Sequence, residues 1–283
     1  MTKKRRLLCE YGPVFYALSL RKEFLRRDIK DLFSRERFAR RRSGELLPHI
    51  VKGHRSQLLR QLEGVDMRLQ HNKVNNLGIA ADKINGLMIA QGQTFSFWRM
   101  IGSVSARKGY QEGLTIVKGK PHSDVGGGLC QLANMVHWLV LNSPLTVTEL
   151  HHHSDALFPD SGRRVPFGTG TSVFYKNVDY RFCNNTGQTV QLALWLEEGS
   201  LCGELRAERP FDCRYRVEEE DHCFVKEGAD YYRVSKVYQR AISRETGETV
   251  ARLLVLDNHS RVMYDHSLIP KAEIKEVMDC DAD

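Results

Sequence analysis

The sequence predicts an α+β protein, with helices in its first part and a mainly antiparallel sheet in its second. Apolar residues recur at helical spacing in residues 18–42 and 54–70. A glycine-rich stretch, DVGGGLCQLANMVHWLVL, leads into a central helix that carries a cysteine at its start. From Val173 onward, β-patterned segments alternate with turn residues. Together these patterns are typical of helices packed on an antiparallel sheet.

In the first part of the chain, after residues 18–42, two segments predict helices and the segment that follows them predicts a pair of strands. Within residues 54–70, four apolar residues form one stripe at spacings of four, three and four: Leu58, Leu62, Val65 and Leu69. Residues 75–89 predict a short helix that ends near Asn85-Gly86, a turn signal. Residues 88–98, MIAQGQTFSFW, predict a strand, a turn at Gln91-Gly92 and a second strand.

The central helix is expected from about Leu129 to Leu141, because Pro144 prevents its continuation. The next segment, LTVTELHHH, is alternating and β-branched, which predicts a strand. Later segments predict strands at TSVFYKN, YRFCNNTG, YYRVSKVYQRAI and ETVARLLVLDNH. Hairpin turns are expected at 185–187 and at Glu198-Gly199.

The expected organisation has three parts. Residues 1–75 form a basic helical segment, residues 76–210 form the core domain, and residues 211–283 form a β-rich extension packed on that core. Residues 1–60 contain 17 Lys and Arg and 6 Asp and Glu, a charge of +11, whereas the other 223 residues carry −4 of the total +7. The basic segment suits an acidic partner or a membrane surface.

Several classes of function are disfavoured by what the sequence lacks. No RNA-binding aromatic signature, paired zinc-finger cysteines or helix-turn-helix pattern is present, so specific nucleic-acid binding is not expected. The seven cysteines show no CxxC spacing, which argues against a disulfide framework. The apolar stretch Tyr11–Leu20 is too short to span a bilayer, and no signal-peptide cleavage site follows it, so a cytoplasmic location is expected.

Cys130 is the candidate nucleophile, because it lies at the expected helix start. A helix N-terminus stabilises a thiolate and can lower the pKa of a cysteine. Gly126, Gly127 and Gly128 allow close approach to the main chain, so nearby backbone N–H groups could hold an oxyanion. Gln131 is a candidate to add or orient a donor there.

A nucleophilic thiol needs a base, and the sequence HHHSD follows the next strand. His151 and His153 share one strand face, so either is a candidate base. A carboxylate would orient the histidine, and the candidates are Asp155, Asp160 and Asp179. Two other interpretations stay open: Cys130 could be a packing residue, or Cys130, His151 and His153 could bind zinc. The leading interpretation requires no metal or cofactor.

Seven stretches resemble the VanW family, which is named for an accessory protein of vancomycin B-type resistance clusters. They run in family order from GQTFSFW and IGSVSARKGYQEGLTI through GGGLCQLAN, SPLTVTE and HSD to FPDSGRRVPFGTGTSVFYKN and DYRFCNNTGQTVQL. The similarity covers about Leu58 to Gly203. The family's motif positions are occupied here by Gly126, Gly127, Gly128, Cys130, Gln131, His153 and Ser154.

The resemblance implies a cell-wall precursor or another peptide as the ligand, and a link to glycopeptide resistance. Many family members carry an aspartate where this chain has Gly170. If that aspartate completes a triad, another residue replaces it here, or there is no triad. The order of Cys130, His153 and then an aspartate is also similar to the layout of transglutaminases and papain-like enzymes.

Three hypotheses therefore stand. The first is a cysteine-dependent amide hydrolase or acyl transferase, with Cys130 as nucleophile, His153 or His151 as base, and Asp160 orienting the base. The second is a non-enzymatic binding or accessory protein that uses the glycine loop, with Ser154 among the binding residues. The third is a zinc protein with cysteine and histidine ligands.

Overall fold

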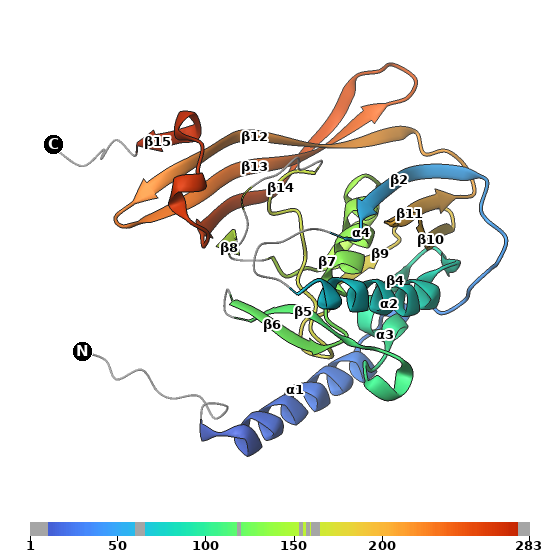
Figure 1. Cartoon of the computed structure of the whole chain (residues 1–283). Coiled ribbons are helices and arrows are strands. Elements are labelled where there is room, and N and C mark those ends of the chain that lie inside the picture. Colours follow the sequence, from blue (N-terminus) through green and yellow to red (C-terminus); the bar gives the residue numbers. More distant parts are fainter. Residues whose placement is uncertain are drawn as a thin grey trace.

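The structure of the chain is a computed structural model that describes residues 11–59, 66–117, 120–152, 155–156, 159 and 165–276. Four α-helices lie in these residues: α1 (Pro13–Phe33), α2 (Met67–Ile84), α3 (Phe97–Ile101) and α4 (Cys130–Leu141). Short 3-10 helices occur at Ala106–Lys108, His266–Leu268 and Lys271–Glu273. With the mainly antiparallel strands around them, these helices confirm the α+β prediction (Figure 1).

One sheet packs directly on the central helix α4. Its strand order is β2 (His49–Gln57), β11 (Ser200–Ala207), β10 (Val190–Glu197) and β3 (Leu87–Ile89), with every neighbouring pair antiparallel. The turn between β10 and β11 lies at Glu198 and Gly199, as predicted, and both residues have a positive φ.

A second sheet places charged residues from distant parts of the chain side by side. Its order is β1 (Arg37–Phe38), β4 (Gln93–Ser96), β9 (Arg181–Cys183) and β7 (Thr146–Glu149). Arg181 of β9 pairs in register with Ser96 of β4 on one side and with Glu149 of β7 on the other. This register is the basis of the ion-pair cluster described below.

The C-terminal residues form a third sheet of long strands. Its order is β15 (Ile274–Glu276), β12 (Cys213–Glu227), β13 (Asp230–Ser243), β14 (Thr249–Val262) and β8 (Asp155–Ala156). Figure 1 shows β12, β13 and β14 in the upper part of the molecule, on the opposite side from α1. The amide of Gln239 on β13 donates to the carbonyl oxygens of Leu141 (2.8 Å) and Ser143 (3.1 Å), which ties this sheet to the end of α4.

The main apolar core surrounds α4. Leu132, Val136, Leu139 and Val140 of this helix are fully buried, and they belong to one cluster with α2 and the first two sheets. A smaller cluster lies under the C-terminal sheet and consists of Ala156, Phe167, Phe224, Val262 and Ile269. A separate hairpin, β5 (Glu112–Val117) with β6 (Lys120–Val125), leads into the glycine loop. Among the described residues, no helix combines the length and apolar character that crossing a bilayer requires.

Several local predictions are confirmed, and four are wrong in whole or in part. The end of α2 at Ile84, the strands around Gln91-Gly92 and the start of α4 agree with the sequence patterns. The helix expected over 18–42 ends early, since α1 stops at Phe33 and residues 37–38 form β1. The helix expected over 54–70 is wrong, because residues 49–57 form β2 against β11 and α2 begins only at Met67. The expected strand at 171–177 is a turn closed by a bridge between Phe174 and Val178. No hairpin forms at 185–187, since β9 and β10 join different sheets.

Candidate functional site

The glycine loop enters α4 through a tight turn that begins where β6 ends at Val125. Gly126 and Gly128 have φ values of 85° and 95°, in the left-handed region that side chains disfavour. The backbone N–H of Gly126 donates to the carbonyl oxygen of Gln111 (2.8 Å), and that of Gly127 donates to Asp124 (3.0 Å). The turn is therefore held on β5 and β6 by main-chain hydrogen bonds.

A glycine is required at position 127 for a different reason, because the backbone of the loop lies very close to the backbone of β5 there. A Cβ at Gly127 would overlap the carbonyl group of Gly113 on β5. The fully buried amide of Asn76 on α2 bridges the same contact, because its Nδ2 donates to the carbonyl oxygens of Gln111 (2.9 Å) and Gly127 (3.0 Å). The loop is thus clamped between α2 and β5, which fixes the position of the first turn of α4.

Cys130 is the first residue of α4, as the sequence predicts. The residue is partly exposed, but its Sγ is buried and lies 4.0 Å from the carbonyl oxygen of Val173. Burial of the sulfur raises the pKa of the thiol above its ordinary value. The expectation that this pKa is lowered at the helix N-terminus is therefore wrong, because burial of the sulfur outweighs the hydrogen bonds that would lower the pKa. At neutral pH the resting thiol is protonated.

Gln131 points away from the loop. Its Nε2 donates to the hydroxyl of Ser56 and to the carbonyl oxygen of Gln57, both at 2.9 Å, so its side chain links α4 to β2. The N-cap residue, Leu129, provides no side-chain cap. The side-chain amide of Gln131 is therefore already bound and is not aimed at an oxyanion at this helix start.

Residues 168–173 run along α4 and bring His151 to the same side of the helix as Cys130. The N–H of Thr171 donates to Oδ1 of Asn134, one turn after Cys130 (2.7 Å). The N–H of Ser172 donates to the carbonyl oxygen of His151 (2.7 Å), and the next residue, Val173, contacts the Cys130 thiol. The backbone of His151 is therefore hydrogen-bonded to the chain segment that contacts the Cys130 thiol.

The carboxylate beside His151 is Glu149, which the sequence analysis did not consider. Nε2 of His151 lies 3.2 Å from Oε1 of Glu149, two residues earlier on the same face of the chain. Burial alone would raise the pKa of Glu149, but hydrogen bonds and the charges of Arg27 and Arg181 outweigh it and lower the pKa to about 2. The signal was present, because Glu149 ends the family stretch SPLTVTE and alternates with His151.

The remaining predicted residues are placed as follows. His153, Ser154 and Asp160 lie outside the described residues. Asp155 begins β8 and pairs in register with Arg261 of β14. Asp179 is bound within an ion-pair cluster. His137, in the middle of α4, is a packed residue whose Nδ1 lies 3.1 Å from the Tyr180 hydroxyl; burial lowers its pKa to about 3, so it is neutral.

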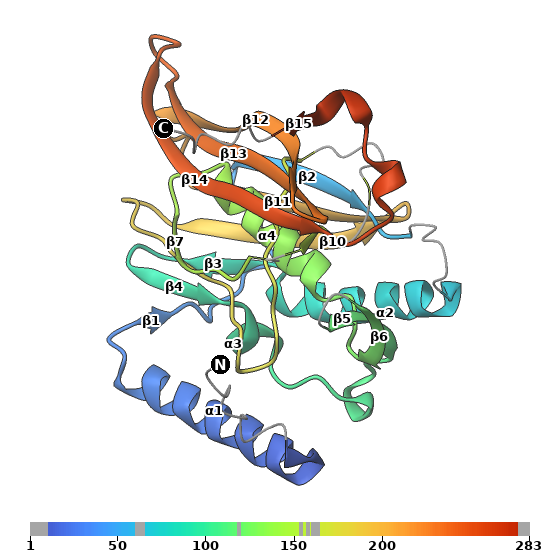
Figure 2. The same ribbon diagram turned by 90° about the vertical axis from the view of Figure 1, so that its left-hand side faces the viewer.

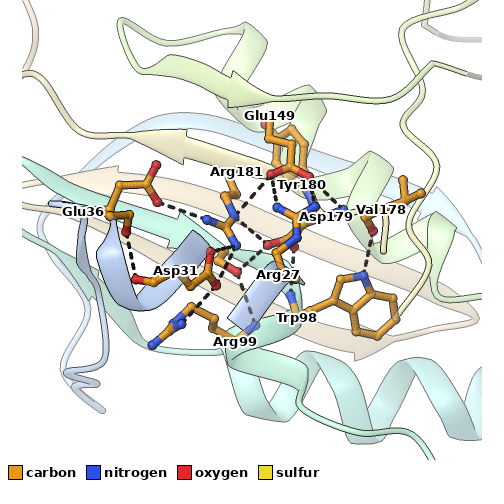
Figure 3. Close-up of polar contacts among 12 residues, drawn as sticks. Arg27, Asp31, Glu36, Trp98, Arg99, Glu149, Val178, Asp179, Tyr180 and Arg181 are labelled. Carbon is orange, nitrogen blue, oxygen red and sulfur yellow. Dashed lines mark hydrogen bonds and ion pairs between the residues drawn. The ribbon is translucent and has the colours of Figure 1, made fainter. Parts of the chain in front are cut away.

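An ion-pair cluster centred on Arg181 occupies the second sheet and α1 (Figure 3). Nε of Arg181 donates to Asp179 (2.8 Å), and its other nitrogens bind Asp31 (2.9 Å) and Glu36 (3.1 Å). Arg27 of α1 donates to both oxygens of Glu149, each at 2.6 Å. Glu149 therefore joins this cluster to His151 and to the segment beside Cys130.

A cavity of about 440 Å³ lies beside this cluster. Aromatic and cationic side chains line it together with the cluster itself: Phe38, Trp98, Tyr175, Arg40, Arg99 and Lys176. Of the described residues that the sequence analysis proposed, Asp179 alone lines the cavity. The described residues also contain no group of three histidine, cysteine, aspartate or glutamate side chains arranged to hold a metal ion.

Comparison with known proteins decides the family. The chain is 30% identical over 218 residues to the vancomycin B-type resistance protein VanW of Enterococcus faecalis (strain ATCC 700802 / V583), covering 77% of this chain and 79% of that relative.

This chain belongs to the VanW family.

The family model for VanW-like proteins matches residues 72–206, from α2 to the end of β11. The chain is also similar to the uncharacterized protein YoaR of Bacillus subtilis (strain 168), to which it is 26% identical over 172 residues. That match covers 61% of this chain and 54% of YoaR, so the chain spans about half the length of this relative. No solved structure matches the chain. The VanW family is thus associated with vancomycin resistance, and the glycine loop and Cys130 lie inside the matched region.

Proposed function

We propose that this VanW-family protein is a cysteine-dependent amide hydrolase or acyl transferase that acts on cell-wall peptides, with Cys130 as its nucleophile. The observation that supports this most is the position of the thiol. Cys130 is the first residue of α4 and is partly exposed as a residue. It follows a loop whose backbone is held between α2 and β5. The name of the Enterococcus faecalis relative supports a cell-wall peptide as the substrate class.

His151 is the described residue that we assign as the base, with His153 as the alternative beyond the described residues. The sulfur attacks the amide carbonyl carbon while the imidazole accepts the thiol proton, and the imidazole then protonates the departing amine. The acyl group is left as a thioester on Sγ. Water or a second amine attacks this thioester, which releases the acid or the transferred product and restores the thiol.

The raised pKa of Cys130 bears on when the thiol proton is transferred in this mechanism. Because burial raises the pKa of the Cys130 thiol, we assign the transfer of its proton to the same step as the attack of the sulfur. Glu149 contributes by holding His151, since its carboxylate remains charged at neutral pH and accepts from the imidazole. We therefore assign Glu149 the orienting role that the sequence analysis gave to Asp160.

The same observation favours one alternative, a binding protein without turnover. A protonated thiol with a buried sulfur is also compatible with a packing role, in which the glycine loop receives a peptide terminus at the start of α4. The two functions differ in whether Cys130 is chemically reactive in the folded protein.

Alkylation of the native protein by iodoacetamide, followed by peptide mass spectrometry, separates them. We expect Cys130 to be modified in the folded state, at a rate that rises with pH beyond the ordinary thiol pKa of about 8.5. Other cysteines of the chain serve as controls, since Cys183 and Cys213 are partly exposed and Cys202 and Cys223 are buried.

Stability measurements complete this test. Cys130→Ser should change the free energy of unfolding by less than about 1 kcal/mol. A Cys130 that stays unmodified until the protein unfolds, as expected for Cys202 and Cys223, would contradict the enzymatic proposal. A loss of several kcal/mol in Cys130→Ser would assign the thiol to packing instead.

A further inference from the structure

Helix α1 contacts the rest of the protein with its charged side chains. Arg27 binds Glu149 (2.6 Å), Asp31 binds Arg181 (2.9 Å), and Asp28 binds Lys176 (2.6 Å). Phe24 adds one aromatic contact, with its ring centroid 5.6 Å from that of Tyr175. No described residue of α1 is buried. This is the reverse of an ordinary surface helix, which turns its apolar side to the core.

The opposite side of α1 is apolar and open to solvent. Its side chains recur at spacings of four, seven, four and three, so they form one stripe along the helix: Val14, Leu18, Leu25, Ile29 and Leu32. Their exposures are 70%, 50%, 61%, 47% and 78%. Tyr11, Phe15 and Phe33 widen the stripe and are also exposed. We call this set of eight residues the outer face of α1.

Positive charge flanks the outer face. Four of the five basic residues of α1 are not bound to the core by any of the contacts above: Arg21, Lys22, Arg26 and Lys30. Glu23, which lies 3.7 Å from Arg26, is the acidic residue on this side, because Asp28 and Asp31 are bound to the core. The sequence adds four cations at residues 3–6, the last of them seven positions before the first residue of the helix.

The position of α1 leaves its outer face accessible to a flat surface. Figures 1 and 2 are related by a rotation about the vertical axis, and α1 forms the lower border of the molecule in both. The sheets and the other helices lie above it. A planar partner could therefore approach α1 from below.

We propose that the outer face of α1 binds the surface of an anionic lipid bilayer, with the helix parallel to the membrane plane. The apolar stripe would enter the boundary between headgroups and acyl chains, and the flanking cations would lie against lipid phosphates, as in interfacial amphipathic helices. A second copy of α1 fits less well, because pairing two outer faces would bring their flanking cations together. The ion pairs to Glu149 and Arg181 would fix the orientation of the core above the membrane.

Sedimentation of the full chain with vesicles tests this inference. We expect binding to phosphatidylcholine vesicles that contain phosphatidylglycerol, weaker binding at high salt, and little binding to phosphatidylcholine alone. The double variant Leu25→Asp/Ile29→Asp should bind about tenfold or more weakly, since burial of each side chain contributes to the affinity. Because both side chains are exposed, thermal unfolding of this variant should match that of the wild type.

A matched control exists on the far side of the molecule. Val250 and Leu253 of β14 are each 60% exposed, so Val250→Asp/Leu253→Asp removes a similar apolar area and should leave vesicle binding unchanged. Absence of wild-type binding, or equal binding by the α1 variant, would overturn the inference. Equal losses in both variants would also overturn it. A dimer in solution that only the α1 variant dissociates, without vesicle binding, would assign the outer face to a second copy.

Discussion

Replacing Asp179 with alanine is expected to lower the free energy of unfolding by about 3 kcal/mol, because a buried cation loses its nearest partner. The side chains of Asp179 and Arg181 are 3% and 4% exposed. Oδ2 of Asp179 accepts from Nε of Arg181 (2.8 Å) and from the hydroxyl of Ser96 (2.6 Å). Its other oxygen accepts from the backbone N–H groups of Trp98 (3.1 Å) and Tyr180 (3.0 Å).

The loss is large because these donors lose their acceptor when the carboxylate is removed, and each unsatisfied buried group costs about 1–3 kcal/mol. Arg181 keeps three other acidic partners in this variant, which limits the total loss of stability: Asp31, Glu36 and Glu149. Urea denaturation measures the change.

A matched control is Asp230→Ala, which removes a surface ion pair of similar length. Asp230 lies 2.7 Å from Arg261, and their side chains are 34% and 50% exposed. This substitution should cost less than about 1 kcal/mol. Equal small losses in both variants would show that the Arg181 cluster does not stabilise the fold.

Gly127→Ala is expected to cost about 3 kcal/mol or more, since the added methyl group would meet backbone rather than a movable side chain. The carbonyl group of Gly113 occupies that space, and Asn76 holds the two segments together from the other side. Relief would require the loop to move off β5, which would also displace the first turn of α4 and Cys130.

Gly187→Ala is the control for this substitution, because nothing lies within 4 Å of its added Cβ and its backbone φ is ordinary. It should change the free energy of unfolding by less than about 0.5 kcal/mol. If Gly127→Ala were equally mild, the close approach of the two backbones would be contradicted.

The parts of the candidate site that depend on local sequence could be predicted. Three consecutive glycines before an apolar helical pattern, and Pro144 after it, place α4 and Cys130 correctly. The turns at Asn85-Gly86 and Glu198-Gly199 also carry their own signals. In each case the residues that define the structure are neighbours in the chain, so no knowledge of the fold is needed.

The parts that depend on distant contacts could not be predicted. The apolar spacing that begins at Leu58 predicts a helix that includes residues 54–57. These residues lie in a strand instead, because they pair with β11. The cluster around Arg181 joins Asp31 to residues 150 positions away. The pKa of Cys130 follows the same logic, since the helix start is a local feature, whereas the burial that raises the pKa depends on how the chain packs around the sulfur.

The most direct measurement of the central claim is rapid mass spectrometry of the intact protein mixed with a synthetic cell-wall stem peptide. The account predicts a thioester adduct on Cys130 in the wild type and in Cys183→Ala, and none in Cys130→Ala. In His151→Ala the adduct should form about 100-fold more slowly, as expected for loss of a general base. Peptide turnover that persists in Cys130→Ala, or a peptide that shields Cys130 from iodoacetamide without forming an adduct, would contradict it.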